Sequence, residues 1–82
     1  MEQNKILEEL QLIFTKFFKT ENIHLTSSSS AKDVDAWDSL NHMSLMGEVE
    51  RSFNIQFEFF ELMDFENIGD LIYGVSEKLN EK

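Results

Sequence analysis

The chain has 82 residues, which suffices for one small domain with a modest core and leaves little room for a deep enzyme cleft. Its net charge of −9 would repel both the phosphate backbone of nucleic acid and an anionic membrane surface. The chain contains no cysteine, so it offers neither a disulfide nor a thiolate nucleophile. The hydrophobic content of 41% predicts a globular fold rather than a disordered acidic tail.

The chain shows no signal for targeting or membrane insertion. Its first residues lack the basic start and the apolar run of a signal peptide, and no apolar run approaches membrane-spanning length. We therefore expect a cytoplasmic protein in which residues 1–82 form a single domain. The acidic charge suits solubility and attraction to partners that carry basic patches.

The first predicted element is a helix from about Glu2 to Thr20, with Asn4 as its expected N-cap. Its apolar residues recur at the helical period on one face, namely Ile6, Leu10, Ile13, Phe14 and Phe17.

A long loop is predicted from Glu21 to Asp38. The four serines Ser27–Ser30 and the neighbouring polar residues compete with the backbone for hydrogen bonds and favour irregular structure. Four apolar residues are expected to pin the loop to the core, namely Ile23, Leu25, Val34 and Trp37. A connection of this length in a small domain is often functional.

The helical period returns from Ser39 to Phe53, and either Asp38 or Ser39 would serve as the N-cap. The expected buried stripe comprises Met43, Met46, Val49 and Phe53, with Leu45 beside it. Gly47 in the helix interior costs about 1 kcal/mol relative to alanine. It either permits the close approach of another group or is tolerated without a role.

The segment from Asn54 to Phe65 is dense in aromatic residues. Residues 55–59 alternate like a strand, but the sequence offers no second strand to pair with. We therefore predict an extended segment followed by a short helix near Phe59 to Met63. The eight phenylalanines are most simply explained as core residues, and the lining of a cargo cavity is the alternative for some of them.

A last helix is predicted after Asn67, which is its expected N-cap, with Asp70 favouring its positive end. Its buried stripe would comprise Ile68, Leu71, Ile72, Val75 and Leu79. The fold class is therefore all-α: a small bundle of three long helices plus one short helix, with the long loop between the first and second helices.

The tripeptide Asp38-Ser39-Leu40 lies where the loop gives way to the second helix. A serine hydroxyl at that point suits a phosphate, because the first backbone N–H groups lack helical partners and the helix dipole is positive there. The surrounding residues 34–43, VDAWDSLNHM, resemble the attachment site of acyl carrier proteins. The resemblance extends to Met43, Leu45, Val49, Glu50 and Phe53 at the same helical offsets, and to residues 65–71, FENIGDL.

The resemblance implies that Ser39 carries 4'-phosphopantetheine, transferred from coenzyme A by a phosphopantetheinyl transferase. It further implies a monomeric carrier that is not itself an enzyme and that holds acyl or aminoacyl groups as thioesters. Its other partners would be the enzymes that load and transfer those groups. The competing interpretation is a small acidic helical interaction module that is never modified.

The same resemblance predicts a docking surface on the second helix, formed by Asp38, Leu40, Met43, Gly47 and Arg51. Asp38 would contact the enzyme that installs the arm, including its metal ion, in addition to capping the helix. The carriers of fatty-acid synthesis usually have acids where this chain has Asn41, Ser44, Arg51 and Ser52. The chain is therefore more similar to specialised stand-alone carriers of lipid, polyketide or surface-polysaccharide pathways.

The remaining polar residues predict no metal site. His24 has no companion at metal-ligand spacing, and His42 is expected to face solvent, with a place beside the arm as the alternative. Asp33, Asp35 and Asp38 fail the calcium-loop template, which needs a glycine at 38 and a glutamate at 44. Four acidic residues are expected to form a solvated face or, alternatively, a partner-docking face, namely Glu58, Glu61, Asp64 and Glu66.

Overall fold

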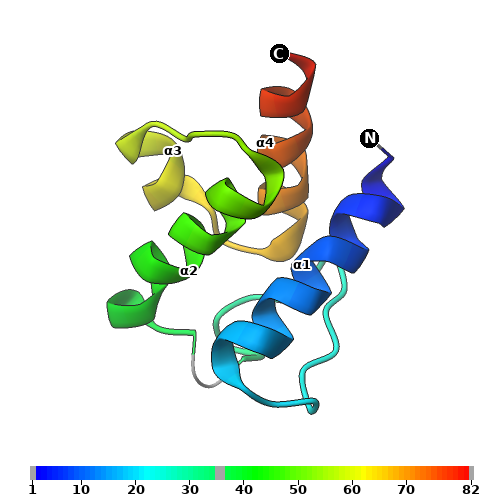
Figure 1. Ribbon diagram of the computed structural model, residues 1–82. Helices are drawn as coiled ribbons and strands as arrows, with labels where there is room; N and C mark the ends of the chain where they lie inside the picture. Colours follow the sequence, from blue (N-terminus) through cyan, green and yellow to red (C-terminus); the bar gives the residue numbers. More distant parts are fainter. Residues whose placement is uncertain (1, 35–36, 82) are drawn as a thin grey trace.

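The computed structural model describes residues 2–34 and 37–81, and this part of the chain folds into four helices (Figure 1). They are α1 (Gln3–Phe18), α2 (Ser39–Phe53), α3 (Phe59–Asp64) and α4 (Ile68–Asn80). α1 packs against both α2 and α4, while the long loop passes from the end of α1 to the start of α2. The predicted all-α bundle of three long helices and one short helix is confirmed.

The core is formed by one side of each helix together with anchors from the long loop. α1 buries Ile6, Leu10 and Phe14, while Ile13 and Phe17 pack at its edge. The other buried apolar residues are Leu25, Val34, Trp37, Leu45, Met46, Val49, Phe53, Phe57, Leu62, Ile68, Leu71, Ile72 and Val75. This distribution confirms the predicted stripes of α1 and α4, except that Leu79 is only partly buried.

The expected cap of α1 was wrong, whereas that of α4 is confirmed. The carbonyl of Glu2 accepts hydrogen bonds from the N–H groups of Lys5 and Ile6, so Glu2 is the N-cap and Asn4 lies inside the first turn of the helix. At α4, the side chain of Asn67 accepts a hydrogen bond of 2.8 Å from the N–H of Asp70. The C-terminal connections of α1 and α2 use Lys19 and Asn54 in the left-handed backbone region.

The long loop is held at both of its sides by hydrogen bonds. The Gln11 side chain donates to the carbonyl of Ile23 and accepts from the N–H of Leu25, which fastens the loop to α1. Near the serine run, the carbonyl of Ser27 accepts a hydrogen bond of 2.7 Å from the N–H of Gly69. A Cβ atom at position 69 would lie 3.0 Å from that carbonyl oxygen, so glycine permits this contact. The loop is thereby hydrogen-bonded to the first turn of α4.

Two predictions about burial were wrong around α2 and α3. Met43 is 43% exposed, whereas Leu45 is fully buried, because the buried side of α2 is centred between Leu45 and Met46. Phe59 and Phe60 are also exposed rather than part of the core. α3 has only six residues and buries a single one, Leu62, so the other apolar residues on it face outward.

Candidate functional site at the start of α2

Ser39 is the first residue of α2, and its side chain is exposed. The Asp38 carboxylate oxygen Oδ1 accepts a hydrogen bond of 3.0 Å from the N–H of Asn41, which makes Asp38 the N-cap of the helix. Asp38 therefore performs the capping, and Ser39 stands beside the cap at the positive end of a 15-residue helix. Asp35 and Ala36, which belong to the predicted motif, lie outside the described residues.

A cleft of about 330 Å³ opens beside Ser39 between α2 and α3. Its lining residues are Ala31, Trp37, Asp38, Ser39, His42, Met43, Phe59, Leu62, Met63, Phe65 and Glu66. Most of the side chains on its α2 and α3 walls are apolar, so the cleft suits a hydrocarbon group held close to the serine.

Exposed apolar side chains surround the serine and the cleft. Leu40, the next residue in the chain, is 87% exposed, and Phe60 on α3 is 67% exposed. Phe59, Met63 and Met43 are exposed as well. Clusters of large apolar residues on a protein surface are typical of surfaces that bind a partner or ligand. The sequence contained the signal, since α3 is rich in aromatic residues, but the face they occupy depends on how α3 packs.

His42 does not face solvent, so that prediction was wrong. Its Nδ1 atom accepts a hydrogen bond of 3.1 Å from Nε1 of Trp37, and the two rings are nearly parallel. Its Nε2 atom lies 2.8 Å from the carbonyl oxygen of Leu62 in α3. His42 therefore links the end of the loop, the first turn of α2 and the last turn of α3, and it lines the cleft beside Ser39.

The solution NMR structure of the holo acyl carrier protein from Geobacter metallireducens is 42% identical to this chain. The match covers 93% of this chain and 87% of that one, with a TM-score of 0.85. The chain belongs to the acyl carrier protein family. The crystal structure of an acyl carrier protein from Thermotoga maritima matches at 23% identity over 99% of this chain and 94% of that one, with a TM-score of 0.86, and supports the fold alone.

No protein-family model and no curated protein matches the chain. Members of the acyl carrier protein family are carriers rather than catalysts, and the Geobacter protein was solved in its holo form. Among residues 2–34 and 37–81, no helix is both long and apolar enough to span a membrane. Within the same residues, no cluster of three or more histidines and acids is arranged to hold a metal ion.

The predicted docking residues of the carrier lie along the outer side of α2. Leu40, Gly47 and Arg51 recur at spacings of seven and four residues on the helix face opposite the core, and Met43 lies nearer the cleft. A Cβ atom built at Gly47 would meet nothing within 4 Å. The packing of this chain therefore does not require a glycine at that position.

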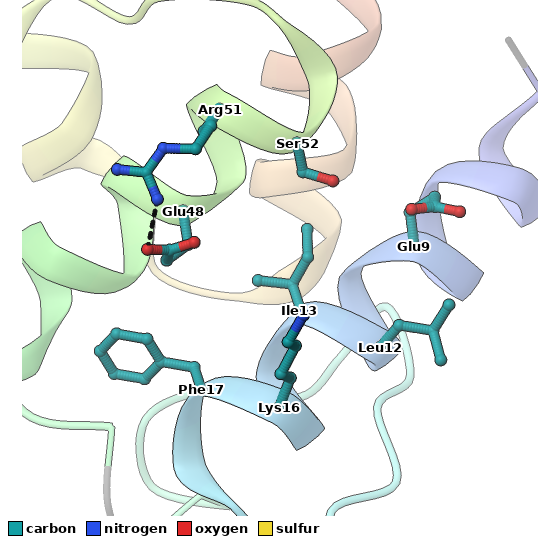
Figure 2. Close-up of a pocket in the computed structure, with 8 residues that line it drawn as sticks. All are labelled: Glu9, Leu12, Ile13, Lys16, Phe17, Glu48, Arg51 and Ser52. Atoms are coloured by element: carbon teal, nitrogen blue, oxygen red, sulfur yellow. Dashed lines mark hydrogen bonds and ion pairs between the residues drawn. The ribbon is translucent and has the colours of Figure 1, made fainter.

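Arg51 lies at a second hollow, about 470 Å³ in volume, between α1 and α2 (Figure 2). Its guanidinium lies 2.7 Å from the carboxylate of Glu48, and both side chains are exposed. Figure 2 shows Ile13 and Phe17 rising from α1 on the opposite side of this hollow. Arg51 lies twelve positions after Ser39 on α2, or about 18 Å along the helix axis, so this hollow is distinct from the serine cleft.

The acidic residues of α3 do not all belong to a solvated face. Glu61 forms a capping box with Glu58 and an ion pair of 3.0 Å with Lys78 of α4. The hydrogen bond from the Glu58 backbone and the contact with Lys78 lower the pKa of Glu61. The hydrogen bond to Glu61 in turn raises the pKa of Lys78. Glu58, Asp64 and Glu66 are exposed, as predicted.

Proposed function

We propose that this acyl carrier protein holds acyl or aminoacyl groups as thioesters on a 4'-phosphopantetheine arm attached to Ser39. It presents them, as a cytoplasmic monomer, to the enzymes of a lipid, polyketide or surface-polysaccharide pathway. The observation that carries this proposal is the position of Ser39, exposed beside the Asp38 cap at the start of α2 and next to an apolar cleft.

The residues around Ser39 fit the proposed group. In the attachment reaction, Ser39 Oγ forms a bond to the pantetheine-side phosphorus of coenzyme A while the pyrophosphate bond breaks, releasing adenosine bisphosphate and the hydroxyl proton. The positive end of the α2 dipole would favour the phosphodiester at that position, although the N–H of Asn41 is already bonded to Asp38. When bound, the group supplies the thiol that the cysteine-free chain lacks.

We further propose that partners dock on a surface formed by two elements. α2 contributes Leu40, Met43, Gly47 and Arg51, and α3 adds Phe59, Phe60 and Met63. Asp38 would contact the metal ion of the phosphopantetheinyl transferase while it caps α2. The exposed apolar residues provide contact area, and the exposed acids Glu58 and Glu66 beside them attract basic residues at the rim of the partner.

The charge pattern of α2 supports a specialised carrier. A basic surface that expects acids along this helix would instead meet Asn41 and Ser44, and then Arg51, whose charge is partly neutralised by Glu48. Fewer complementary charges slow the encounter with such a partner and change which partner is preferred. We therefore assign this protein to a pathway other than housekeeping fatty-acid synthesis.

The decisive experiment is mass spectrometry after incubation with coenzyme A and a promiscuous phosphopantetheinyl transferase. The wild type should gain one phosphopantetheinyl group, Ser39→Ala should gain none, and the matched control Ser44→Ala should behave as the wild type. Because Asp38 is the cap, Ser39→Ala should change the free energy of unfolding by less than about 0.5 kcal/mol. A wild type that stays unmodified would instead favour the interaction module.

A further inference from the structure

His42 joins three elements in the wall of the cleft beside Ser39. One ring nitrogen accepts from Nε1 of Trp37 at 3.1 Å, and the other lies 2.8 Å from the carbonyl oxygen of Leu62. The last four carbonyls of a helix lack helical partners, and in the six-residue α3 Leu62 is one of these. His42 therefore satisfies a carbonyl that α3 itself leaves unpaired.

The two partners of His42 fix its tautomer. The indole N–H of Trp37 can only donate, so Nδ1 of His42 must present a lone pair. The carbonyl oxygen of Leu62 can only accept, so Nε2 must carry the proton. Both hydrogen bonds thus exist together only in the neutral Nε2–H form of the imidazole.

The Trp37–His42–Leu62 link belongs to the wall of the cleft, and two of its three residues, Trp37 and Leu62, also belong to the core. All three residues line the cleft, and Trp37 and Leu62 are themselves buried. The indole of Trp37 also meets the ring of Phe14 edge-on, with the ring centroids 5.2 Å apart, and Phe14 is a fully buried residue of α1. A group that passed the link would therefore enter the packed interior of the bundle.

We propose that His42 is a specificity-determining residue that ends the cargo cleft and limits the length of hydrocarbon that this carrier can shelter. This inference rests on the proposed attachment of cargo at Ser39. Short cargo lies in the outer cleft against Met43, Phe59 and Met63. Longer cargo requires both hydrogen bonds of His42 to break, which leaves the Trp37 N–H and the Leu62 carbonyl without partners among apolar side chains.

The link itself is tested on the unloaded protein. Nitrogen-15 NMR of the His42 ring should show the Nε2–H tautomer, and an Nδ1–H tautomer would overturn the proposal. Trp37 is the only tryptophan, so its fluorescence reports on the link directly. His42→Ala should shift the emission to longer wavelength, whereas His24→Ala, a change at the other and exposed histidine, should leave it unchanged.

The role in specificity is tested by loading acyl groups of increasing length from acyl-coenzyme A with the transferase. Hydroxylamine then cleaves the thioesters, and slow cleavage indicates that the cleft protects the acyl group from the reagent. In the wild type, this protection should increase with acyl-chain length only for short chains and then level off. In His42→Ala, protection should go on increasing for longer chains, and cleavage of the longest chain should be about tenfold slower than in the wild type. This factor corresponds to the free energy of the two hydrogen bonds that long cargo must break in the wild type.

His42→Gln serves as the conservative variant, since its side-chain amide can accept from Trp37 and donate to Leu62. It should keep the wild-type length limit, which also guards against a misfolded His42→Ala. Identical length dependence in the wild type and His42→Ala would overturn the role of His42 alone. A failure of any loading at Ser39 would overturn the proposed function and this role with it.

Discussion

α4 and α3 are both rich in large apolar residues, but α4 buries most of them in the core whereas α3 exposes most of them to solvent. α4 buries Ile68, Leu71, Ile72 and Val75 and packs against α1. α3 buries Leu62 and leaves Phe59, Phe60 and Met63 in solvent beside the serine cleft. The two helices are joined by an ion pair between Glu61 and Lys78.

The difference shows how a domain of this size divides its apolar residues between stability and recognition. Burying a large apolar side chain contributes about 1.5–3 kcal/mol. α4 buries four of its six large apolar residues in this way, whereas Tyr73 is exposed and Leu79 is partly buried. α3 gives up that contribution at three positions and obtains an apolar surface next to Ser39 instead. If the comparison holds, substitutions on α4 should change stability, and substitutions on α3 should change the interaction with partners.

The largest expected effect is the loss of core packing in α4. Leu71 is fully buried, so Leu71→Ala should lower the free energy of unfolding by about 2–5 kcal/mol. Phe60→Ala on α3, the matched truncation of an exposed residue, should change it by less than about 0.5 kcal/mol. Urea denaturation followed by circular dichroism measures both. A loss at Phe60 comparable to that at Leu71 would contradict the division between the two helices.

The next effect separates capping from recognition at Asp38. Asp38→Ala removes the cap and should cost about 1 kcal/mol, whereas Asp38→Asn keeps a capping oxygen and should leave stability nearly unchanged. Both variants remove the carboxylate proposed to contact the transferase metal, so both should slow attachment by about tenfold or more. Denaturation and the rate of attachment are measured on the same samples. Normal attachment to Asp38→Asn would assign Asp38 to capping alone.

The sequence predicted the fold well because the dominant signals are local. The helical period of α1 and α4 and the cap at Asn67 each depend on residues a few positions apart. The cap of α1 was placed wrongly at Asn4, since a polar residue of a favoured type also occurs inside the first turn. The serine run was correctly predicted as loop. Its hydrogen bonds to Gly69 and Ile68 could not be predicted, because they join backbone groups that are distant in the sequence.

The sequence predicted the attachment residue of the candidate site, but it did not predict the exposed aromatic residues and the hydrogen bonds that surround it. Ser39 could be selected because the motif and the start of a helix coincide in sequence. The exposure of Phe59 and Phe60 depends on which side of the short α3 meets the core, and aromatic composition does not decide that. The link through His42 ends on a backbone carbonyl 20 residues away, which no side-chain pattern encodes.

Gly47 of α2 and Gly74 of α4 provide a test whose expected effect is similar in size to the loss of the Asp38 cap. At Gly47 an added Cβ meets nothing within 4 Å, so Gly47→Ala should stabilise the protein by about 1 kcal/mol. At Gly74 of α4 it would lie 2.9 Å from the ring of Phe65, so Gly74→Ala should not show this gain. Thermal unfolding measures both. If Gly47→Ala is stabilised and also slows attachment, close approach of a partner explains the glycine.

The smallest effect concerns the ion pair that joins α3 to α4. The pKa of Glu61 is lowered in the folded protein, chiefly by the hydrogen bond from the Glu58 backbone and also by Lys78. The stability it contributes is therefore complete above the unfolded carboxyl pKa of about 4.3 and is lost as the pH falls through the lower folded value. Glu61→Gln retains the capping-box hydrogen bond and removes only the charge.

The free energy of unfolding of Glu61→Gln should therefore lie below that of the wild type at pH 7, and the two should converge as the pH falls below the carboxyl range. Because the pair is partly exposed, added salt should shrink the difference. Glu77→Gln, an exposed acid of α4, serves as the control and should show no comparable convergence. A difference that persists unchanged in acid would show that Glu61 stabilises the α3–α4 contact through packing rather than charge.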